Sequence, residues 1–252
     1  MYRAVFLMEL NMSNIKSRDL IIFGVLLFSG LSIAGICIGR GMYKSRTHDR
    51  YVTVKGLAER EVEANLAIWP ITFSVTGDSL NSINREIDKN RTVIMSFLTK
   101  SGFDSSMISH SPPKITDTKA ERYYGEKVTH QYRYIAHTTV TLRTEKVKKA
   151  KNAMEKAGDL VSSGVAISEQ NWNNSTEFIF TNLNGIKPEM IEEATQNARE
   201  TAQKFAQDSG SKIGKIRNAA QGFFSISDRD KNSPDYKKIR VVTTIEYYLI
   251  DN

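Results

Sequence analysis

The chain has 252 residues, of which 40% are hydrophobic and 25% charged, enough to bury a core in one domain or two small ones. A single cysteine, Cys37, excludes a disulfide framework and any multi-cysteine metal site within one chain, and four histidines are few for a metalloenzyme. The net charge of +7 comes mostly from residues 1–50, which hold seven Lys/Arg and three Asp/Glu. Residues 51–252 are only weakly basic, and we expect no nucleic acid as a partner.

An uncharged run over residues 20–38 predicts a membrane segment. As a helix its nineteen residues span about 28 Å, close to the hydrocarbon thickness of a bilayer. We interpret residues 20–39 as an uncleaved transmembrane anchor. Two alternatives stay open: cleavage as a signal sequence at the small residues of 32–34, and lipidation of Cys37, although the residue before it is not small.

Basic residues flank this run on both sides. They are Arg3, Lys16 and Arg18 before it, and Arg40, Lys44, Arg46 and Arg50 after it. A membrane helix is usually oriented with the more positive flank in the cytoplasm. Here the two flanks are nearly equal in charge, so charge does not decide the orientation. The expected organisation is a cytoplasmic segment 1–19, the anchor or signal sequence 20–39, a polar linker 40–50 and a folded domain 51–252.

The first half of the domain alternates between the two-residue period of strands and the longer period of helices. Its predicted elements, in chain order, are strands 51–63 and 66–76, helix 80–101, strand 107–115, strand 131–143 and helix 145–157. Pro70 in the second strand predicts an edge or a bulge. Asp78 and Ser79 are the candidate N-caps of the first helix, and Gly158 is expected to break the second.

The second half repeats this outline. Its predicted elements, in chain order, are strands 165–171 and 177–182, helix 188–209, strand 213–224, a charged loop 229–238 and strand 239–250. Pro188 is expected in the first turn of the helix, and Phe205 on its buried stripe. Strand–helix–strand–strand thus occurs at 66–143 and again at 175–250. We predict an α+β domain of two such halves with a mostly antiparallel sheet.

No motif of the sequence carries recognisable chemistry. His110 lies between two serines, but neighbouring residues of a strand point to opposite faces, so we expect no Ser–His pair. His130 and His137 would face opposite sides of one strand, which disfavours a shared metal. The sequence has no Gly-rich phosphate loop and no HExxH or GxSxG motif. We assign no catalytic, cofactor-binding or metal-binding residue and expect no cofactor.

Four tyrosines form the most unusual local group: Tyr123, Tyr124, Tyr132 and Tyr134. One interpretation is a core face together with a hairpin tip. The other is an interaction surface, because tyrosine is enriched at protein interfaces. We take the four as the candidate interaction site.

Four stretches carry a resemblance to a known family. They are Val52-Thr53-Val54-Lys55-Gly56, Tyr132-Arg133-Tyr134-Ile135-Ala136, Ala198-Arg199-Glu200-Thr201-Ala202-Gln203-Lys204-Phe205-Ala206 and Gly210-Ser211-Lys212-Ile213-Gly214-Lys215-Ile216. Together with the order of the elements, they resemble the SIMPL-domain family, also called domain of unknown function 541, over about residues 51–250. The resemblance implies an α+β domain in the periplasm or envelope of a bacterium, associated with oxidative stress and often forming homo-oligomers. It implies no catalytic residues.

We therefore expect a single-pass protein of the bacterial inner membrane, held by residues 20–39, with its C-terminal domain in the periplasm. The expected function is that of a self-assembling module or one that binds envelope protein partners, rather than an enzyme. Self-association is expected because the long strands 66–76, 131–143 and 239–250 are prone to pairing with another chain if they lie at an edge. The alternative is a ligand-binding protein or enzyme whose site is too scattered to see in the sequence.

Overall fold

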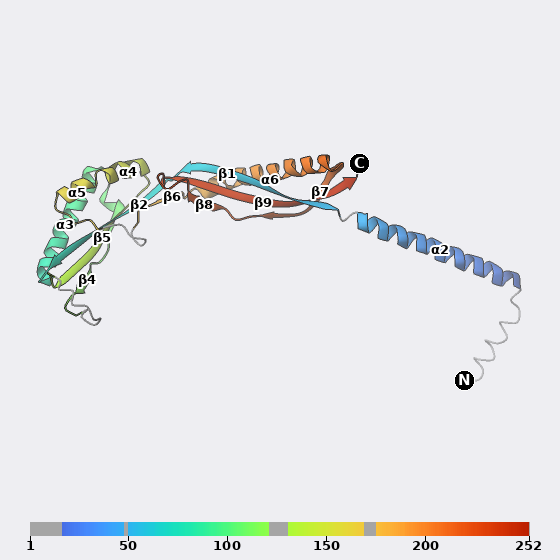
Figure 1. The fold of residues 1–252 in the computed structure, drawn as a ribbon, viewed down its shortest axis with the longest axis horizontal. Helices are drawn as coiled ribbons and strands as arrows, with labels where there is room; N and C mark the ends of the chain where they lie inside the picture. Colours follow the sequence, from blue (N-terminus) through green and yellow to red (C-terminus); the bar gives the residue numbers. More distant parts are fainter. Residues whose placement is uncertain (1–16, 48–49, 121–130, 169–174, 252) are drawn as a thin grey trace, which may run out of the picture. The chain divides into compact units, whose positions relative to one another are not determined.

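The computed structural model describes residues 17–47, 50–120, 131–168 and 175–251. Its elements, in chain order, are α2 (Ser17–Thr47), β1 (Tyr51–Glu63), β2 (Leu66–Gly77), α3 (Leu80–Lys100), the 3-10 turn η1 (Ser105–Met107), β3 (Ile108–His110), β4 (Lys114–Asp117), β5 (Tyr134–Thr144), α4 (Val147–Glu155), α5 (Gly158–Ser162), β6 (Glu177–Ile179), α6 (Leu183–Asp208), β7 (Ser211–Gln221), β8 (Ser225–Asp228) and β9 (Tyr236–Asp251) (Figure 1). They form two compact units. Unit 1 comprises Met1–Lys55, Ala198–Ala220 and Thr244–Asn252, and unit 2 comprises Gly56–Asn197 and Gln221–Thr243.

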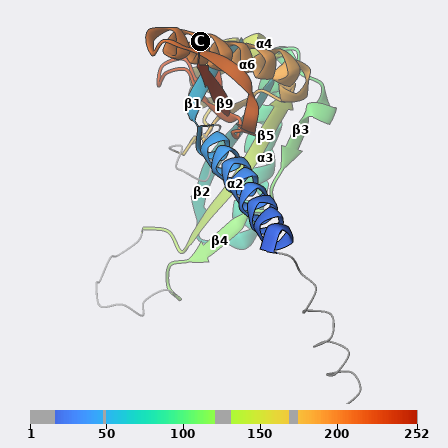
Figure 2. The ribbon, with the colours of Figure 1, turned by 90° about the vertical axis from the view of Figure 1, so that its right-hand side faces the viewer.

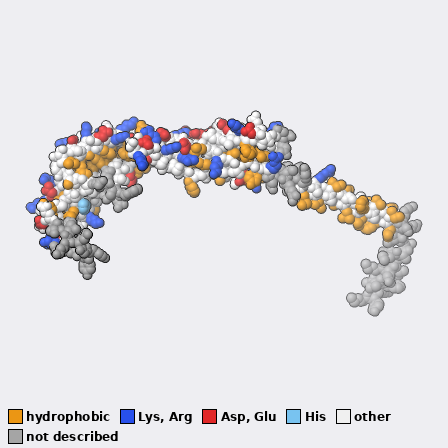
Figure 3. All heavy atoms as spheres, viewed as in Figure 1, with side chains coloured by type: hydrophobic (Ala, Val, Ile, Leu, Met, Phe, Trp, Pro, Cys, Tyr) orange, Lys and Arg blue, Asp and Glu red, His pale blue; other side chains and the backbone are white. Residues whose placement is uncertain are grey.

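Helix α2 contains the predicted membrane segment. Its stretch Leu20–Met42 has a mean hydropathy of 2.5 and is long and apolar enough to cross a membrane, and none of it is buried. Apolar side chains line it (Figure 3). The helix continues to Thr47, so most of the predicted linker 40–50 is helical. No proline interrupts this stretch, and the helical hydrogen bonds therefore run on beyond the apolar run.

Unit 2 contains a five-stranded sheet of order β3-β5-β2-β6, with β4 also paired to β5. The pairs β2–β5, β2–β6, β3–β5 and β4–β5 are all antiparallel, as predicted. Alternate residues of β2 and β5 point into a core that α3, α4 and α5 complete. Its most buried side chains include Ile71, Phe73, Ile83, Ile87, Ile94, Leu98, Val140, Leu142 and Leu160.

Pro70 lies in β2 opposite Thr141 of β5, in the interior of this sheet rather than in an edge strand. Thr72 and Ser74 follow Pro70 by two and four residues, so their backbone groups point to the same side of the strand as those of Pro70. They form hydrogen bonds with the segment 166–168, on the side away from β5. The nitrogen of Pro70 therefore faces that side as well. There it interrupts no described ladder bond, because β6 pairs only with Leu66–Ile68.

A second sheet has the order β1-β9-β7, and β8 also pairs with β9. Figure 2 shows α6 lying along this sheet. In unit 1, the small residues Ala198 and Ala202 of α6 pack against a cluster formed with Val52, Val54, Ile245 and Tyr247. In unit 2, Met190 and Ala194 of α6 pack against Ala58, Ile239 and Val241. The four-residue spacing of small side chains along α6 lets the helix lie close to the strands.

Two predictions for α6 are wrong. The helix begins at Leu183, so Pro188 lies inside it rather than in its first turn, and no acidic residue falls in that turn. Glu189 instead binds Arg60 of β1, with 2.7 Å between Oε2 and Nη1. Phe205, predicted on the buried stripe, is 52% exposed. It follows Ala202 by three residues rather than four, so it lies at the margin of the helix face formed by Ala194, Ala198 and Ala202.

Several element boundaries also differ from the prediction. Residues 107–115 form two short strands, β3 and β4, separated by Pro112 and Pro113, which cannot donate ladder bonds. Gly158, predicted as a helix break, starts a separate helix, α5. In the predicted strand 165–171, the described residues form one bridge, between Ile167 and Phe73. The predicted loop 229–238 is shorter, because β9 begins at Tyr236.

The three long strands expected to be prone to pairing are all interior. β2 lies between β5 and β6, β5 between β2 and the short strands β3 and β4, and β9 between β1 and β7. Their backbone groups are therefore engaged on both sides over much of their length. The edge position on which the expected self-association rested does not apply to these three strands.

Candidate functional site

Of the four tyrosines predicted as an interaction site, the structure describes Tyr132 and Tyr134. Tyr123 and Tyr124 lie outside the described residues. Tyr132 is 40% exposed, just before β5. Tyr134, the first residue of β5, is half-buried and packs against the core of unit 2. Of the described pair, only Tyr132 offers a largely accessible ring.

Arg133, between these two tyrosines, joins three segments of unit 2. Its guanidinium donates to Asp117 of β4, with 3.0 Å between Nη2 and Oδ2, and lies 4.9 Å above the Tyr134 ring. Its amide donates to Oδ1 of Asp78, at the turn before α3, over 3.0 Å. The hydrogen bonds from Arg133 hold the pKa of Asp117 below its ordinary value. This arrangement fixes the entry into β5 and is structural in character.

A second surface, which the sequence did not single out, lies along residues 221–228 of unit 2 and is called here the β8 edge. Strand β8 pairs with β9, from Ser225 opposite Arg240 to Asp228 opposite Lys237, and no other pairing of β8 is described. Phe223 is 100% exposed and Ile226 is 43% exposed. Phe224, the next residue after Phe223, is partly buried and packs against the cluster that includes Met190.

Gly222 sets the geometry of this edge. Its amide donates a hydrogen bond of 2.8 Å to the Val242 carbonyl, and a Cβ at Gly222 would meet that oxygen at 2.5 Å. Only a residue without a side chain fits this approach. The close contact holds the chain against β9 while Phe223 points into solvent.

The β8 edge also carries few of the charges that usually protect an edge strand. Residues 218–227 contain no charged residue and no proline. By contrast, β1, at the other end of the same sheet, carries Lys55, Glu59, Arg60, Glu61 and Glu63. The outer strands β3, β4 and β6 of the other sheet are only three or four residues long. Charges and shortness both discourage pairing with another chain; β8 is itself only four residues long and ends at Asp228, but residues 218–227 carry no charge.

The histidines and serines form no catalytic arrangement within the described part of the chain. His110 of β3 and His137 of β5 are both exposed, and His130 lies outside the described residues. The Ser111 hydroxyl lies 3.1 Å from the amide of Thr139, which donates to it. Among described residues, no group of three His, Cys, Asp or Glu side chains is placed to hold a metal ion.

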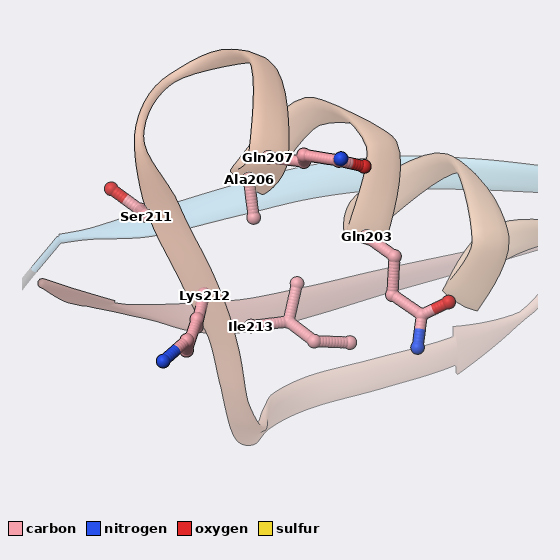
Figure 4. A pocket seen from close by; sticks show the side chains of 6 residues that line it. All are labelled: Gln203, Ala206, Gln207, Ser211, Lys212 and Ile213. Atoms are coloured by element: carbon pink, nitrogen blue, oxygen red, sulfur yellow. The ribbon is translucent and has the colours of Figure 1, made fainter. Parts of the chain in front are cut away.

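The described cavities are partly open to solvent, and their linings mix polar and apolar side chains. One of about 370 Å³ in unit 1 lies between the end of α6 and the start of β7, where Lys212 points away from Ile213 (Figure 4). One of about 580 Å³ in unit 2 is lined by Arg143, Lys146 and Ser106, among others. Within the described residues, neither Arg143 nor Lys146 has an ion-pair partner.

The fold and these surfaces define a mixed α/β protein with an N-terminal helix long enough to span a membrane. Residues 52–242 match the family model described as SIMPL, a protein of unknown function (DUF541). Because the match covers most of the chain, the chain belongs to this family. No curated protein matches the sequence.

Proposed function

We propose that this chain is a membrane-anchored module of the bacterial envelope that self-associates by pairing its β8 edge with that of a second copy. The observation that carries the proposal is the fully exposed Phe223 within the uncharged run 218–227 of this edge. Burying a phenylalanine side chain contributes about 1.5–3 kcal/mol, and unpaired strand groups supply hydrogen bonds with little rearrangement.

The charges flanking the uncharged run favour a second copy as the occupant. Lys215 and Arg217 precede the run, and Asp228 and Asp230 follow it. Antiparallel pairing about a two-fold axis between residues 222 and 223 aligns position 217 of one copy with 228 of the other, and 215 with 230. Opposite charges then face each other at both ends, beside the pairs that Asp228 and Asp230 already make with Lys237 and Arg229, and two Phe223 rings lie near the axis.

Cross-linking in native membranes tests this pairing. Gln221→Cys in a Cys37→Ala background keeps Phe223 and places two thiols near the proposed axis, within reach of a short bismaleimide. We expect a covalent dimer from this variant, little from the matched control Lys231→Cys on an exposed loop, and loss of the dimer when Phe223→Lys is added. Equal cross-linking from positions 221 and 231 would contradict the pairing.

For localisation, we propose that α2 stays uncleaved in the inner membrane and that the domain lies in the periplasm. The apolar surface of α2 and its position ahead of the family domain support this. A thiol at Lys231→Cys, again without Cys37, should react with an impermeant maleimide in intact cells once the outer membrane is permeabilised. Reaction only after the inner membrane is lysed would place the domain in the cytoplasm.

A link to oxidative stress is part of the proposal, and the family resemblance supports it. Peroxide survival of a deletion strain tests it, with complementation by the native chain and by Phe223→Lys. We expect the native chain to restore survival and the variant to restore less.

Ligand binding is the second candidate function, and the cavity containing Arg143 and Lys146 favours it. Two cations without ion-pair partners among the described residues would suit a small anion such as a phosphate ester. An increase in thermal stability with such an anion, lost in Arg143→Gln, would support this candidate over self-association.

A further inference from the structure

One end of unit 1 brings together the start of β1, the end of β9 and the start of β7 (Figure 1). The Leu249 amide donates to the Arg50 carbonyl over 2.8 Å. A Cβ at Gly214 of β7 would lie 3.0 Å from Cδ1 of Ile250. This end of unit 1 is called here the tip, and it comprises Arg50, Tyr51, residues 209–216 and Ile250.

The chain length keeps the tip close to the end of α2. Only residues 48–50 separate α2 from β1, and four Cα–Cα steps span at most about 15 Å. Helix α2 continues five residues beyond Met42, the end of its apolar stretch, which adds about 8 Å. If α2 spans a membrane, the tip is therefore within reach of the headgroup layer.

The charge of the tip complements an anionic surface. Lys212 and Lys215 are exposed and have no ion-pair partner among the described residues. The parts of unit 1 that follow residue 49 contain seven Lys/Arg and four Asp/Glu. Arg40 adds a positive charge towards the same end of α2.

Exposed apolar side chains accompany these cations. Ile250 is 53% exposed, Ile216 50% and Tyr51 46%, and Phe205 near the end of α6 is 52% exposed. Tyr51 also lies 3.9 Å beneath the Arg217 guanidinium, which leaves an amphipathic aromatic group at the tip. Aromatic and aliphatic side chains next to lysines are typical of surfaces that rest in the headgroup region of a bilayer.

We infer that the tip is a lipid-binding surface that docks on anionic phospholipid headgroups through Lys212 and Lys215, with Ile250 and Tyr51 in the interface. The inference rests on the proposed membrane anchor. It assigns the tip a role distinct from that of the β8 edge: docking sets the height and orientation of unit 1 above the bilayer.

The test uses the full chain in nanodiscs of phosphatidylcholine, with or without phosphatidylglycerol. A fluorophore at Ser209→Cys, in a Cys37→Ala background, reports quenching by lipids that carry a quencher in the headgroup. We expect quenching about two- to three-fold stronger on the anionic bilayer, and loss of this difference at high salt. The variant Lys212→Glu/Lys215→Glu should lose it too, whereas the matched control Lys156→Glu/Lys231→Glu, which changes exposed lysines of unit 2, should retain it.

Two outcomes separate this inference from the proposed function. A chain that stays in the bilayer after alkaline carbonate treatment, yet is quenched equally on both lipid mixtures or is unaffected by Lys212→Glu/Lys215→Glu, overturns the lipid-binding tip alone. A chain that carbonate releases contradicts the anchor, and the inference falls with it.

Discussion

Gly222 and Val242 are in closer contact than any residue with a side chain would permit, because a Cβ at 222 would lie 2.5 Å from the Val242 carbonyl oxygen. The hydrogen bond between their backbones, 2.8 Å long, holds the β8 edge against β9. This relationship determines where Phe223 emerges from the sheet.

Replacing Gly222 should therefore destabilise the fold. We expect Gly222→Ala to lower the free energy of unfolding by about 1–3 kcal/mol, because the backbone must shift to relieve the contact. Chemical denaturation of the full chain in detergent measures this. Gly158→Ala is the matched control: nothing lies within 4 Å of its Cβ position, and it should be neutral or stabilising. Equal effects of the two changes would contradict the close contact.

A buried and an exposed phenylalanine should differ in how much they contribute to stability. Phe73 is 0% exposed in the core of unit 2, whereas Phe223 is 100% exposed. We expect Phe73→Ala to cost about 3–5 kcal/mol and Phe223→Ala less than about 0.5 kcal/mol when both are measured at a protein concentration where the chain is monomeric. A large loss of stability from Phe223→Ala would mean that its ring packs within the chain.

The Asp117–Arg133 ion pair should make stability depend on acid pH. Because hydrogen bonds from Arg133 lower the pKa of Asp117, folding favours the ionised carboxyl. The stabilisation is therefore present above the ordinary carboxyl pKa of about 4 and is lost as pH falls through the lower folded-state pKa. We expect Asp117→Asn to reduce the fall in Tm between pH 7 and pH 3. Asp159→Asn, whose carboxyl makes no hydrogen bond or ion pair within the described residues, serves as control and should leave the fall unchanged.

The two described tyrosines of the predicted interaction site should differ in their effect on stability. Tyr134 packs against the core and beneath Arg133, so Tyr134→Ala should lower the free energy of unfolding by about 1–2 kcal/mol. Tyr132→Ala should change it by less than about 0.5 kcal/mol. If Tyr132 contributes to an interface, its loss should instead weaken self-association, which a dilution series would reveal.

Local patterning was sufficient to predict much of this fold. The alternation from Tyr51 to Glu63 and the helical spacing of Ile83, Ile87 and Ile94 predicted β1 and α3 closely, because one face of each element is buried. The start of α6 was missed because a proline indicates the first turn, where its missing N–H costs no hydrogen bond, whereas here the helix begins five residues before Pro188.

The β8 edge was not predictable in the same way. Which strand lies at an edge depends on pairing between residues far apart in the chain, and the alternation of residues 239–250 gives no sign that β1 and β7 cover both sides of β9. The one available signal was the absence of charge over residues 218–227. The full exposure of Phe223 and the partial burial of Phe224 could not be predicted from two adjacent, identical residues.

Sedimentation equilibrium of the full chain in density-matched detergent, over a roughly hundredfold range of concentration, tests the proposed self-association most directly. The expected result is a concentration-dependent shift from monomer to dimer for the native chain. Phe223→Lys, which adds a protecting charge to the β8 edge, should remain monomeric over the same range, while Lys231→Glu should behave as the native chain. A native chain that is monomeric throughout, or a Phe223→Lys variant that dimerises as well as the native chain, would contradict the account.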